Sequence, residues 1–284
     1  MAPTCRVFAV VNQKGGVGKT TTAVNLATAF AVSERPTLLL DFDPQANASS
    51  AFGGAHDGLQ VYDALSGRSV MKDVVQPTEL RYLHLVPSGR DLYGAEIELV
   101  AATDRERCLE RALADVRDSY EILLIDCPPS LGLLTVNALA AADAVIVPLQ
   151  CEYYALEGLA GLMETIEIVR GHLNPRLVLE GIVLTMADLR NNLARQVEQE
   201  VRRHFSERVF RTVIPRNVRL SEAPSHGKPA ILYDADSKGS RSYLELAEEI
   251  LQRIERPVPP LEPPAVSVAA LTPASRQGET GEVR

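Results

Sequence analysis

The residues with the clearest chemistry form a glycine-rich loop, Lys14-Gly15-Gly16-Val17-Gly18-Lys19-Thr20. Glycines let successive backbone N–H groups turn toward one centre, where they can bind phosphate oxygens. Lys19 can reach the β- and γ-phosphates of a nucleotide, and the Thr20 hydroxyl can ligate Mg²⁺. An apolar, β-branched run at residues 6–12 precedes the loop, and helical periodicity follows at residues 20–33. Strand, loop and helix in this order predict a nucleotide-phosphate site rather than an ordinary glycine-rich turn.

The loop departs from the usual spacing of such sites. The pattern G-x-x-x-x-G-K-[ST] would place glycine at position 13, where this chain has Gln13, and Lys14 is an additional cation. The loop is therefore a variant of the common pattern at both positions.

Three aspartates stand at the ends of apolar runs. Asp41 and Asp43 end the run at residues 37–42, and Asp126 ends the run at residues 121–126. Strand alternation points Asp41 and Asp43 the same way, toward the carboxyl edge where parallel sheets bind ligands. An acidic residue at a strand tip can hold Mg²⁺. Each could instead be a solvated carboxylate or a helix N-cap, but the nearby phosphate loop favours a magnesium site.

Apolar runs and helix-like segments alternate along the chain and indicate the elements that position these groups. The expected strands are residues 6–12, 37–42, 82–86, 121–126, 144–149, 177–185 and 211–214. The expected helices are residues 20–33, 105–117, 131–142, 155–172, 192–205 and 240–254. Uninterrupted apolar runs indicate strands covered on both faces. We therefore expect one α/β domain over residues 1–256, a P-loop NTPase fold whose mostly parallel, twisted sheet has helices on both faces.

Composition adds further expectations. Residues 257–284 hold six prolines and little that could form a core, so we expect a disordered tail. The formal net charge is −8, yet residues 186–241 contain eleven Lys/Arg against seven Asp/Glu, which leaves room for a basic face that binds phosphates. The four cysteines form no C-x-x-C pair, which favours a reducing compartment. Without a signal peptide or a long apolar segment, a cytoplasmic protein is expected.

The loop of the form K-G-G-x-G-K-T resembles the deviant Walker A motif of the ParA/MinD superfamily of dimerising ATPases. Further motifs at residues 41–47 (DFDPQAN), 126–132 (DCPPSLG), 150–158 and 213–229 resemble those of the Soj-type branch of ParA, the chromosome-partitioning ATPases. The resemblance covers roughly residues 6–254. It implies an ATP hydrolase whose cofactors are ATP and Mg²⁺.

The resemblance also implies roles for individual residues. Lys14, which would reach the partner's nucleotide, Lys19 and Asp43, which would activate the hydrolytic water, are the candidate catalytic residues. Thr20, Asp43 and Asp126 are the candidate magnesium residues. The candidate nucleotide-binding residues are Lys14, Gly15, Gly16, Val17, Gly18, Lys19, Thr20, Thr21, Met186, Pro215 and Asn217.

A switch cycle follows from the resemblance. ATP binding would give a homodimer that binds double-stranded DNA without sequence preference and associates with the nucleoid, and a ParB/Spo0J-type centromere-binding protein would stimulate hydrolysis and release it. Arg190 and Arg219 match the family's DNA-contacting arginines. Less specific candidates for DNA binding, taken from the same basic stretch, are Arg202, Arg203, Lys228, Lys238 and Arg241.

Other functions remain as alternatives. A MinD-like membrane-cycling ATPase would need a basic amphipathic C-terminal helix, whereas residues 243–254 have an acidic outer face, and we expect no membrane partner. A relative of the nitrogenase iron protein would need cluster ligands, for which only Cys127 and Cys151 are candidates. A phosphotransferase or ligase would need an acceptor motif, which we do not find. A dinucleotide oxidoreductase is disfavoured because the loop lacks G-x-G-x-x-G.

Overall fold

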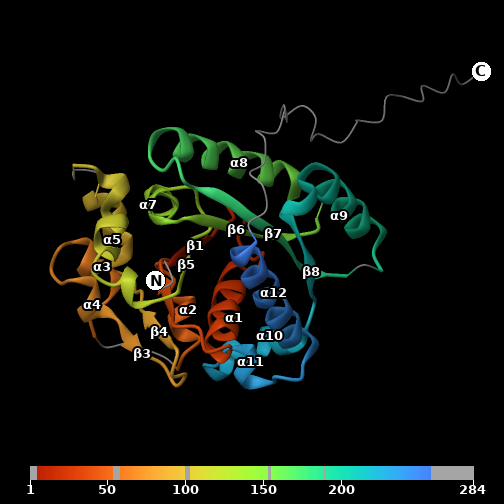
Figure 1. The fold of residues 1–284 in the computed structure, drawn as a ribbon, viewed down its shortest axis with the longest axis horizontal. Coiled ribbons are helices and arrows are strands. Elements are labelled where there is room, and N and C mark those ends of the chain that lie inside the picture. Colours follow the sequence, from red (N-terminus) through yellow and green to blue (C-terminus); the bar gives the residue numbers. More distant parts are fainter. Residues whose placement is uncertain (1–4, 54–57, 100–102, 153–154, 189, 257–284) are drawn as a thin grey trace, which may run out of the picture.

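Eight strands form one sheet in the computed structural model, which describes residues 5–53, 58–99, 103–152, 155–188 and 190–256 (Figure 1). Their order across the sheet is β3-β4-β2-β5-β1-β6-β7-β8. The strands are β1 (Arg6–Val10), β2 (Thr37–Asp41), β3 (Gln76–Pro77), β4 (Leu83–Val86), β5 (Ile122–Asp126), β6 (Ala144–Gln150), β7 (Val178–Ala187) and β8 (Val209–Pro215). All neighbouring strands run parallel except β3 and β4. The predicted α/β class with a mostly parallel sheet is confirmed.

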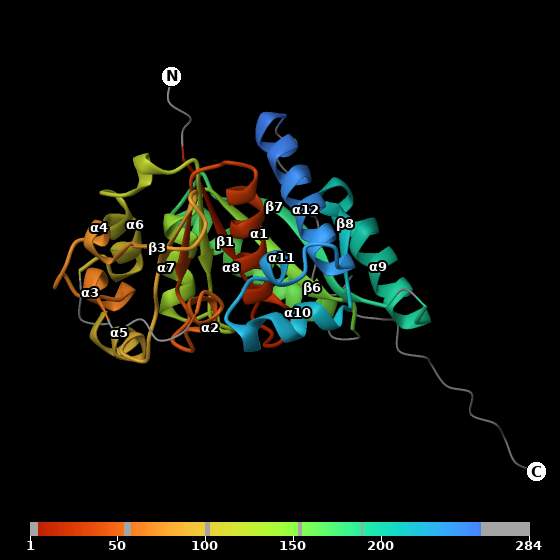
Figure 2. The same cartoon turned by 90° about the horizontal axis from the view of Figure 1, so that it is seen from below.

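Helices cover both faces of the sheet. On one side lie α7 (Leu133–Ala141), α8 (Ala155–His172) and α9 (Asn192–Phe205), and on the other lie α1 (Lys19–Val32) and α12 (Lys238–Glu255) (Figures 1 and 2). Short helices fill the remaining connections. They are α2 (Asn47–Ser50), α3 (Val61–Leu65), α4 (Met71–Val74), α5 (Leu92–Glu98), α6 (Cys108–Leu113), α10 (Val218–Glu222) and α11 (Ala230–Tyr233).

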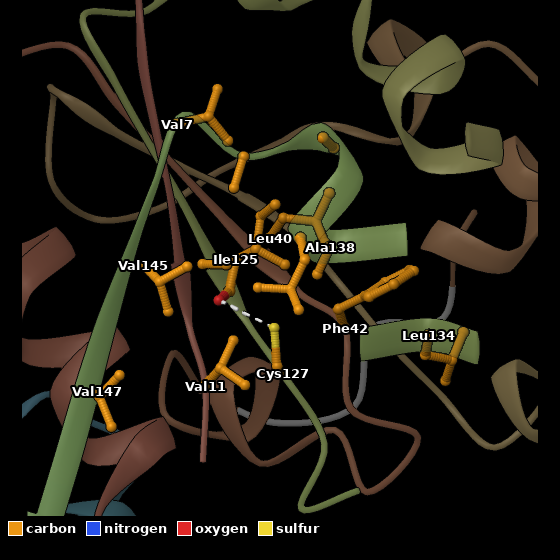
Figure 3. Packing of buried hydrophobic residues seen from close by; sticks show 14 of the residues in the cluster. Val7, Val11, Leu40, Phe42, Ile125, Cys127, Leu134, Ala138, Val145 and Val147 are labelled. Atoms are coloured by element: carbon orange, nitrogen blue, oxygen red, sulfur yellow. Dashed lines mark hydrogen bonds between the residues drawn. The ribbon is translucent and has the colours of Figure 1, made fainter. Parts of the chain in front are cut away.

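The central strands are buried on both faces because their side chains alternate between two apolar clusters. In β1, Val7 belongs to the cluster beneath α7 and α8, whereas Phe8 belongs to the cluster beneath α1 and α12. Figure 3 shows the first cluster, with Ile125 of β5 and Leu134 and Ala138 of α7. This double burial explains why the strands appear in the sequence as continuous apolar runs.

One expected helix is interrupted. Residues 105–117 form a 3₁₀ turn (Arg105–Arg107) and α6, followed by a second 3₁₀ turn (Arg117–Ser119). The backbone leaves helical geometry at Arg107, where φ is −117° and ψ is 13°. The prediction of a single helix there was wrong, because only Cys108–Leu113 keeps α-helical geometry.

The last described helix, α12, ends at Glu255, and the predicted tail at residues 257–284 lies outside the described residues. Within the described part of the chain, none of the helices combines the length and the apolar character that crossing a bilayer requires.

Candidate functional site

The glycine-rich loop joins β1 to α1 at the carboxyl edge of the sheet. Gly16 and Gly18 have φ angles of 75° and 88°, a left-handed conformation that glycine adopts without strain. Gly18 directly precedes α1, so the free N–H groups of the first helical turn face the loop. The Thr185 hydroxyl, at the end of β7, donates a hydrogen bond to the carbonyl of Val17 at 2.7 Å. The loop is thereby held in the shape of an anion cradle.

The two lysines of the loop point in different directions. Lys19 is 7% exposed, and its ammonium group donates to the Lys14 carbonyl oxygen at 3.0 Å. Burial lowers the pKa of Lys19, while the carboxylates of Asp126 and Asp43 act in the opposite direction. Lys14 instead extends out of the loop and forms an ion pair with Glu152. One cation therefore lies over the cradle and the other at the surface beside it.

Gln13, which replaces the usual glycine, connects the loop to α8. Its side-chain amide donates to the carbonyl of Gly158 at 3.1 Å. The preceding Asn12 accepts a hydrogen bond from the Lys14 amide at 2.9 Å and donates to Pro148 of β6 at 2.7 Å. The departure from the common spacing therefore anchors the first half of the loop to β6 and α8.

Asp41 and Asp126 are neighbours in register across β2 and β5, but their surroundings differ. Asp41 is fully buried and accepts hydrogen bonds from the Asp43 amide at 3.2 Å and from the amide and hydroxyl of Ser49, both at 2.7 Å. Its carboxylate therefore fixes the loop between β2 and α2. Asp43, which lines the cavity described below, accepts from the Gln45 amide at 2.9 Å.

Asp126 has no such partners. Neither carboxylate oxygen makes a hydrogen bond of good geometry with the described residues, although both are buried. Burial and the nearby Asp41 carboxylate raise the pKa of Asp126 well above its ordinary value, and the Thr20 hydroxyl opposes this in part. An orphaned buried carboxylate beside a threonine hydroxyl fits a magnesium ion. No group of three His, Cys, Asp or Glu residues suited to a metal occurs in the described ranges, so phosphate oxygens would complete the coordination.

A cavity of about 430 Å³ opens beside the loop and brings together most of the predicted nucleotide-binding residues. Its lining includes residues far apart in sequence, from Gly15 to Tyr243. The lining residues are Gly15, Gly16, Gly18, Lys19, Thr20, Thr21, Asp43, Gln45, Asn47, Pro129, Thr185, Met186, Ile214, Pro215, Arg216, Asn217, Leu220, Ser221, Pro224 and Tyr243. Lys14 and Val17 are not among them. Asn217 also caps α10, because its side-chain oxygen accepts from the Arg219 amide at 2.9 Å.

Sequence reasoning missed several of these lining residues. Thr185, Arg216 and Tyr243 come from the carboxyl-terminal half of the chain, and only the fold brings them to the loop. Tyr243 is buried on α12, and its hydroxyl lies 3.1 Å from that of Thr22 on α1. A larger, more open depression of about 840 Å³ lies at the opposite edge, between α9, β8 and α12. It contains neither the loop nor the aspartates, so we place the nucleotide in the smaller cavity.

The candidate DNA-binding residues fall into two groups. Arg190 follows β7, Arg219 lies on α10, and Lys238 and Arg241 lie in the first turn of α12, all near the carboxyl edge that holds the loop. Lys228 lies close by, on a smaller cavity that Thr20 also lines. Arg202 and Arg203 stand at the far end of α9, where Arg202 donates to the carbonyl of Phe210 at the start of β8.

The four cysteines are buried and unpaired. Cys127 points into the apolar core among Val11, Ile125 and Phe42 (Figure 3), and burial raises its pKa well above the ordinary value. Its sulfur is therefore enclosed by apolar side chains. Cys151 is also buried, and burial raises its pKa to about 11, which disfavours the thiolate that a cluster needs. The geometry of these two cysteines gives no support to the cluster-bridging alternative.

Comparisons with known proteins identify the relatives of the chain. The family model described as "AAA domain" matches residues 5–179. The chain is 56% identical to "Chromosome partitioning protein ParA" of Myxococcus xanthus (strain DK1622), over 87% of this chain and 88% of that protein. It is 52% identical to "Sporulation initiation inhibitor protein Soj" of Bacillus subtilis (strain 168), over 86% and 98%.

Solved structures resemble the fold as well. A Mycobacterium smegmatis structure titled as cobyrinic acid a,c-diamide synthase, with a bound ATP analogue and magnesium, superposes with a TM-score of 0.78 at 36% identity. The match covers 89% of this chain and 96% of that one. These similarities confirm the resemblance on which the expected fold, ATPase activity and cofactors depended. The chain belongs to the ParA/Soj family of chromosome-partitioning ATPases.

Proposed function

We propose that this ATPase is a nucleotide-controlled switch in chromosome or plasmid partitioning. With ATP and Mg²⁺ it would form a homodimer that binds DNA non-specifically, and a ParB/Spo0J-type partner would release it by stimulating ATP hydrolysis. The observation that carries the proposal is that two lysines of one loop point in different directions. Lys19 lies over the cradle of its own chain, and Lys14 extends to the surface where a second chain can approach.

The residues of one chain divide the work at the phosphates. The N–H groups of the loop and Lys19 would bind and orient the phosphates. Thr20 and Asp126 would hold Mg²⁺, whose contribution when bound is to neutralise charge on the phosphates. Asp43, at the edge of the cavity, would position the attacking water, and Asp41 would hold the Asp43 loop in place through Ser49.

Lys14 would act in the partner subunit's site. Its amide is fixed by Asn12, so the backbone holds the side chain at the rim of the loop. A lysine ammonium brought to the partner's γ-phosphate adds charge stabilisation that exists only in the dimer. Dimerisation would thereby depend on ATP, and the Mycobacterium smegmatis structure with an ATP analogue and magnesium supports this choice of ligand for the fold.

DNA would bind at the carboxyl edge through Arg190 and Arg219, with Lys228, Lys238 and Arg241 nearby. Cations that contact phosphates carry no base information, so binding should be non-specific and should weaken steeply as salt rises. The positions of Arg202 and Arg203 at the far end of α9 make them weaker candidates for the same surface. Association with the nucleoid would follow from such binding.

The membrane-cycling alternative receives little support. The outer face of α12 carries Glu245, Glu248 and Glu255, which an anionic bilayer would repel. Its apolar residues Tyr243, Leu246 and Ile250 are buried against the sheet. A helix that uses its apolar face in the core has none left to insert between lipids.

The test is retention of the Asp43→Ala protein on random-sequence duplex DNA at low salt, with ATP and with ADP. We expect strong retention with ATP only, and its loss as salt rises. Arg219→Glu in the same background should lose DNA and keep ATP-dependent dimerisation, whereas Arg170→Glu on α8 should keep both. Equal or absent retention with the two nucleotides would refute the switch, and binding to anionic liposomes would then be measured.

A further inference from the structure

Arg219, the α10 arginine at the proposed DNA surface, is held between two carboxylates of its own chain. Its guanidinium lies 2.9 Å from Glu222 on the same short helix and 3.1 Å from Asp234 at the end of α11. The three side chains remain 49%, 41% and 32% exposed, so DNA can reach them. One cation and two anions give this cluster a net charge of −1, which disfavours an approaching phosphate.

Asp234 is fixed independently of Arg219. Its carbonyl accepts hydrogen bonds from the Ser237 amide at 3.2 Å and from the Ser240 hydroxyl at 2.7 Å. Both serines belong to the turn and the first residues of α12, which packs on α1. The carboxylate is therefore presented to Arg219 by a rigid part of the fold.

Other arginines at this edge have similar partners. Arg190 forms hydrogen bonds with both oxygens of Asp188 at 2.8 and 2.9 Å, and these hydrogen bonds lower the pKa of Asp188 to about 2. Arg241 lies 2.8 Å from Asp236. Lys228 and Lys238 are exposed, and neither forms an ion pair with another of the described residues. Four carboxylates thus offset much of the charge of the five candidate cations at this edge.

In the proposed cycle, a single chain without ATP should bind DNA only weakly, although it carries the same cations as each subunit of the dimer. We propose that Glu222 and Asp234 compete with DNA phosphates for Arg219, so that a single chain binds DNA weakly and retention requires the two copies of this surface that the ATP dimer provides. The inference rests on the proposed DNA-binding function. According to this inference, the two carboxylates determine how much more tightly the ATP dimer binds DNA than the single chain does.

The expected gain in DNA affinity is modest for one chain and larger for the dimer. Exposed ion pairs of this kind are weak, so freeing Arg219 from one carboxylate should tighten the binding of a single chain by only about 2- to 5-fold. A dimer carries the change twice on one surface, so its DNA affinity should rise by about the square of that factor, about 4- to 25-fold. Both gains should disappear at high salt, because screening weakens all contacts with phosphate.

The experiment measures equilibrium binding of random-sequence duplex DNA by fluorescence anisotropy over a salt series. Glu222→Gln and Asp234→Asn are each compared with the parent, as single chains with ADP and as ATP dimers in the Asp43→Ala background. Glu167→Gln on α8 is the matched control. It neutralises a glutamate that pairs with Arg170 at 3.0 Å with the same three-residue spacing, but far from the carboxyl edge. We expect it to leave DNA affinity unchanged.

A double-mutant cycle separates competition for Arg219 from a general change in charge. In the Arg219→Ala background, Asp234→Asn should give no gain. An equal gain in both backgrounds would overturn the inference, and so would the absence of any gain in a parent that binds DNA with ATP. A parent that does not bind DNA with ATP at low salt would refute the proposed function itself, and with it this inference.

Discussion

Lys14 and Glu152 form an ion pair that holds the proposed trans-acting lysine against its own chain. Lys14 lies in the phosphate loop, and Glu152 lies two residues after the end of β6. The two side chains are 43% and 47% exposed. A pair so exposed contributes about 1 kcal/mol or less. In the proposed dimer, the γ-phosphate of the partner's ATP, which carries more charge than a carboxylate, would therefore draw Lys14 away from Glu152.

Glu152→Gln should strengthen ATP-dependent dimerisation by about 2- to 5-fold, because Lys14 no longer has to leave a carboxylate. Lys14→Ala should abolish the dimer and leave ATP binding by the single chain nearly unchanged. Sedimentation equilibrium in the Asp43→Ala background measures the dimerisation of both variants. Glu157→Gln on α8 is the control, because it makes the same change in charge as Glu152→Gln. A weaker dimer with Glu152→Gln would mean that Glu152 itself contributes to the dimer contact.

Lys19→Ala should weaken ATP binding at least about 100-fold, since it removes a charge-assisted contact in a buried position, worth about 3 kcal/mol. Lys72→Ala removes an exposed lysine of α4 and should bind ATP as the parent does. Isothermal titration calorimetry gives both affinities. Near-parent binding by the Lys19→Ala protein would show that the loop amides alone hold the phosphates.

Replacement by asparagine should change the stability of the nucleotide-free protein in opposite directions at Asp41 and at Asp126, which are neighbours in register. Asp126→Asn relieves a buried carboxylate without a hydrogen-bond partner, so it should stabilise the nucleotide-free protein by about 1–2 kcal/mol while impairing magnesium-dependent hydrolysis. Asp41→Asn turns an amide NH2 toward either the Asp43 amide or the two donors of Ser49, so it should destabilise by about 1–3 kcal/mol. Thermal unfolding without nucleotide and magnesium measures both. A shift in the same direction would contradict this account of Asp126.

Features that depend on residues close together in the sequence, such as the loop, the strands and the long helices, could be predicted. The spacing of Lys14, Lys19 and Thr20 identified the loop, and the apolar runs identified seven of the eight strands, because a strand covered on both faces has a local signature. Helices α8 and α9 were predicted with the bounds observed, since each has a long run of regular periodicity. The helices between residues 47 and 98 were missed, because four to seven residues cannot establish a period.

Features that depend on distant residues could not be predicted. Tyr243 reaches the cavity only because α12 packs on α1, and the partners of Asp41 follow from the path of the chain after β2. The sequence grouped Arg202 with Arg219 as basic residues of one stretch. Helix α9, running back along the sheet, separates them to opposite edges. Similarly, no local pattern paired Arg219 with Asp234.

Glu249 offers a test of the fold that does not depend on the nucleotide. It is 6% exposed on α12, and its carboxylate accepts hydrogen bonds at 3.0 Å from the amides of Arg211 and Thr212 in the edge strand β8. The Thr212 hydroxyl and Arg253 also donate to it at 3.0 Å. Burial acts to raise the pKa of Glu249, but these donors outweigh it, and the pKa lies below its ordinary value of 4.5.

A depressed carboxyl pKa in the folded state stabilises the fold above the unfolded pKa, and this contribution is lost as pH falls through the folded value. Glu249→Gln should therefore lower the free energy of unfolding by about 2–3 kcal/mol at pH 7. The difference from the parent should shrink as pH falls below about 4.5. Urea unfolding at several pH values measures it, with the exposed Glu245→Gln on the same helix as control. A difference that stays constant from neutral to acid pH would contradict this account, because it would show that the charge of Glu249 contributes nothing to stability.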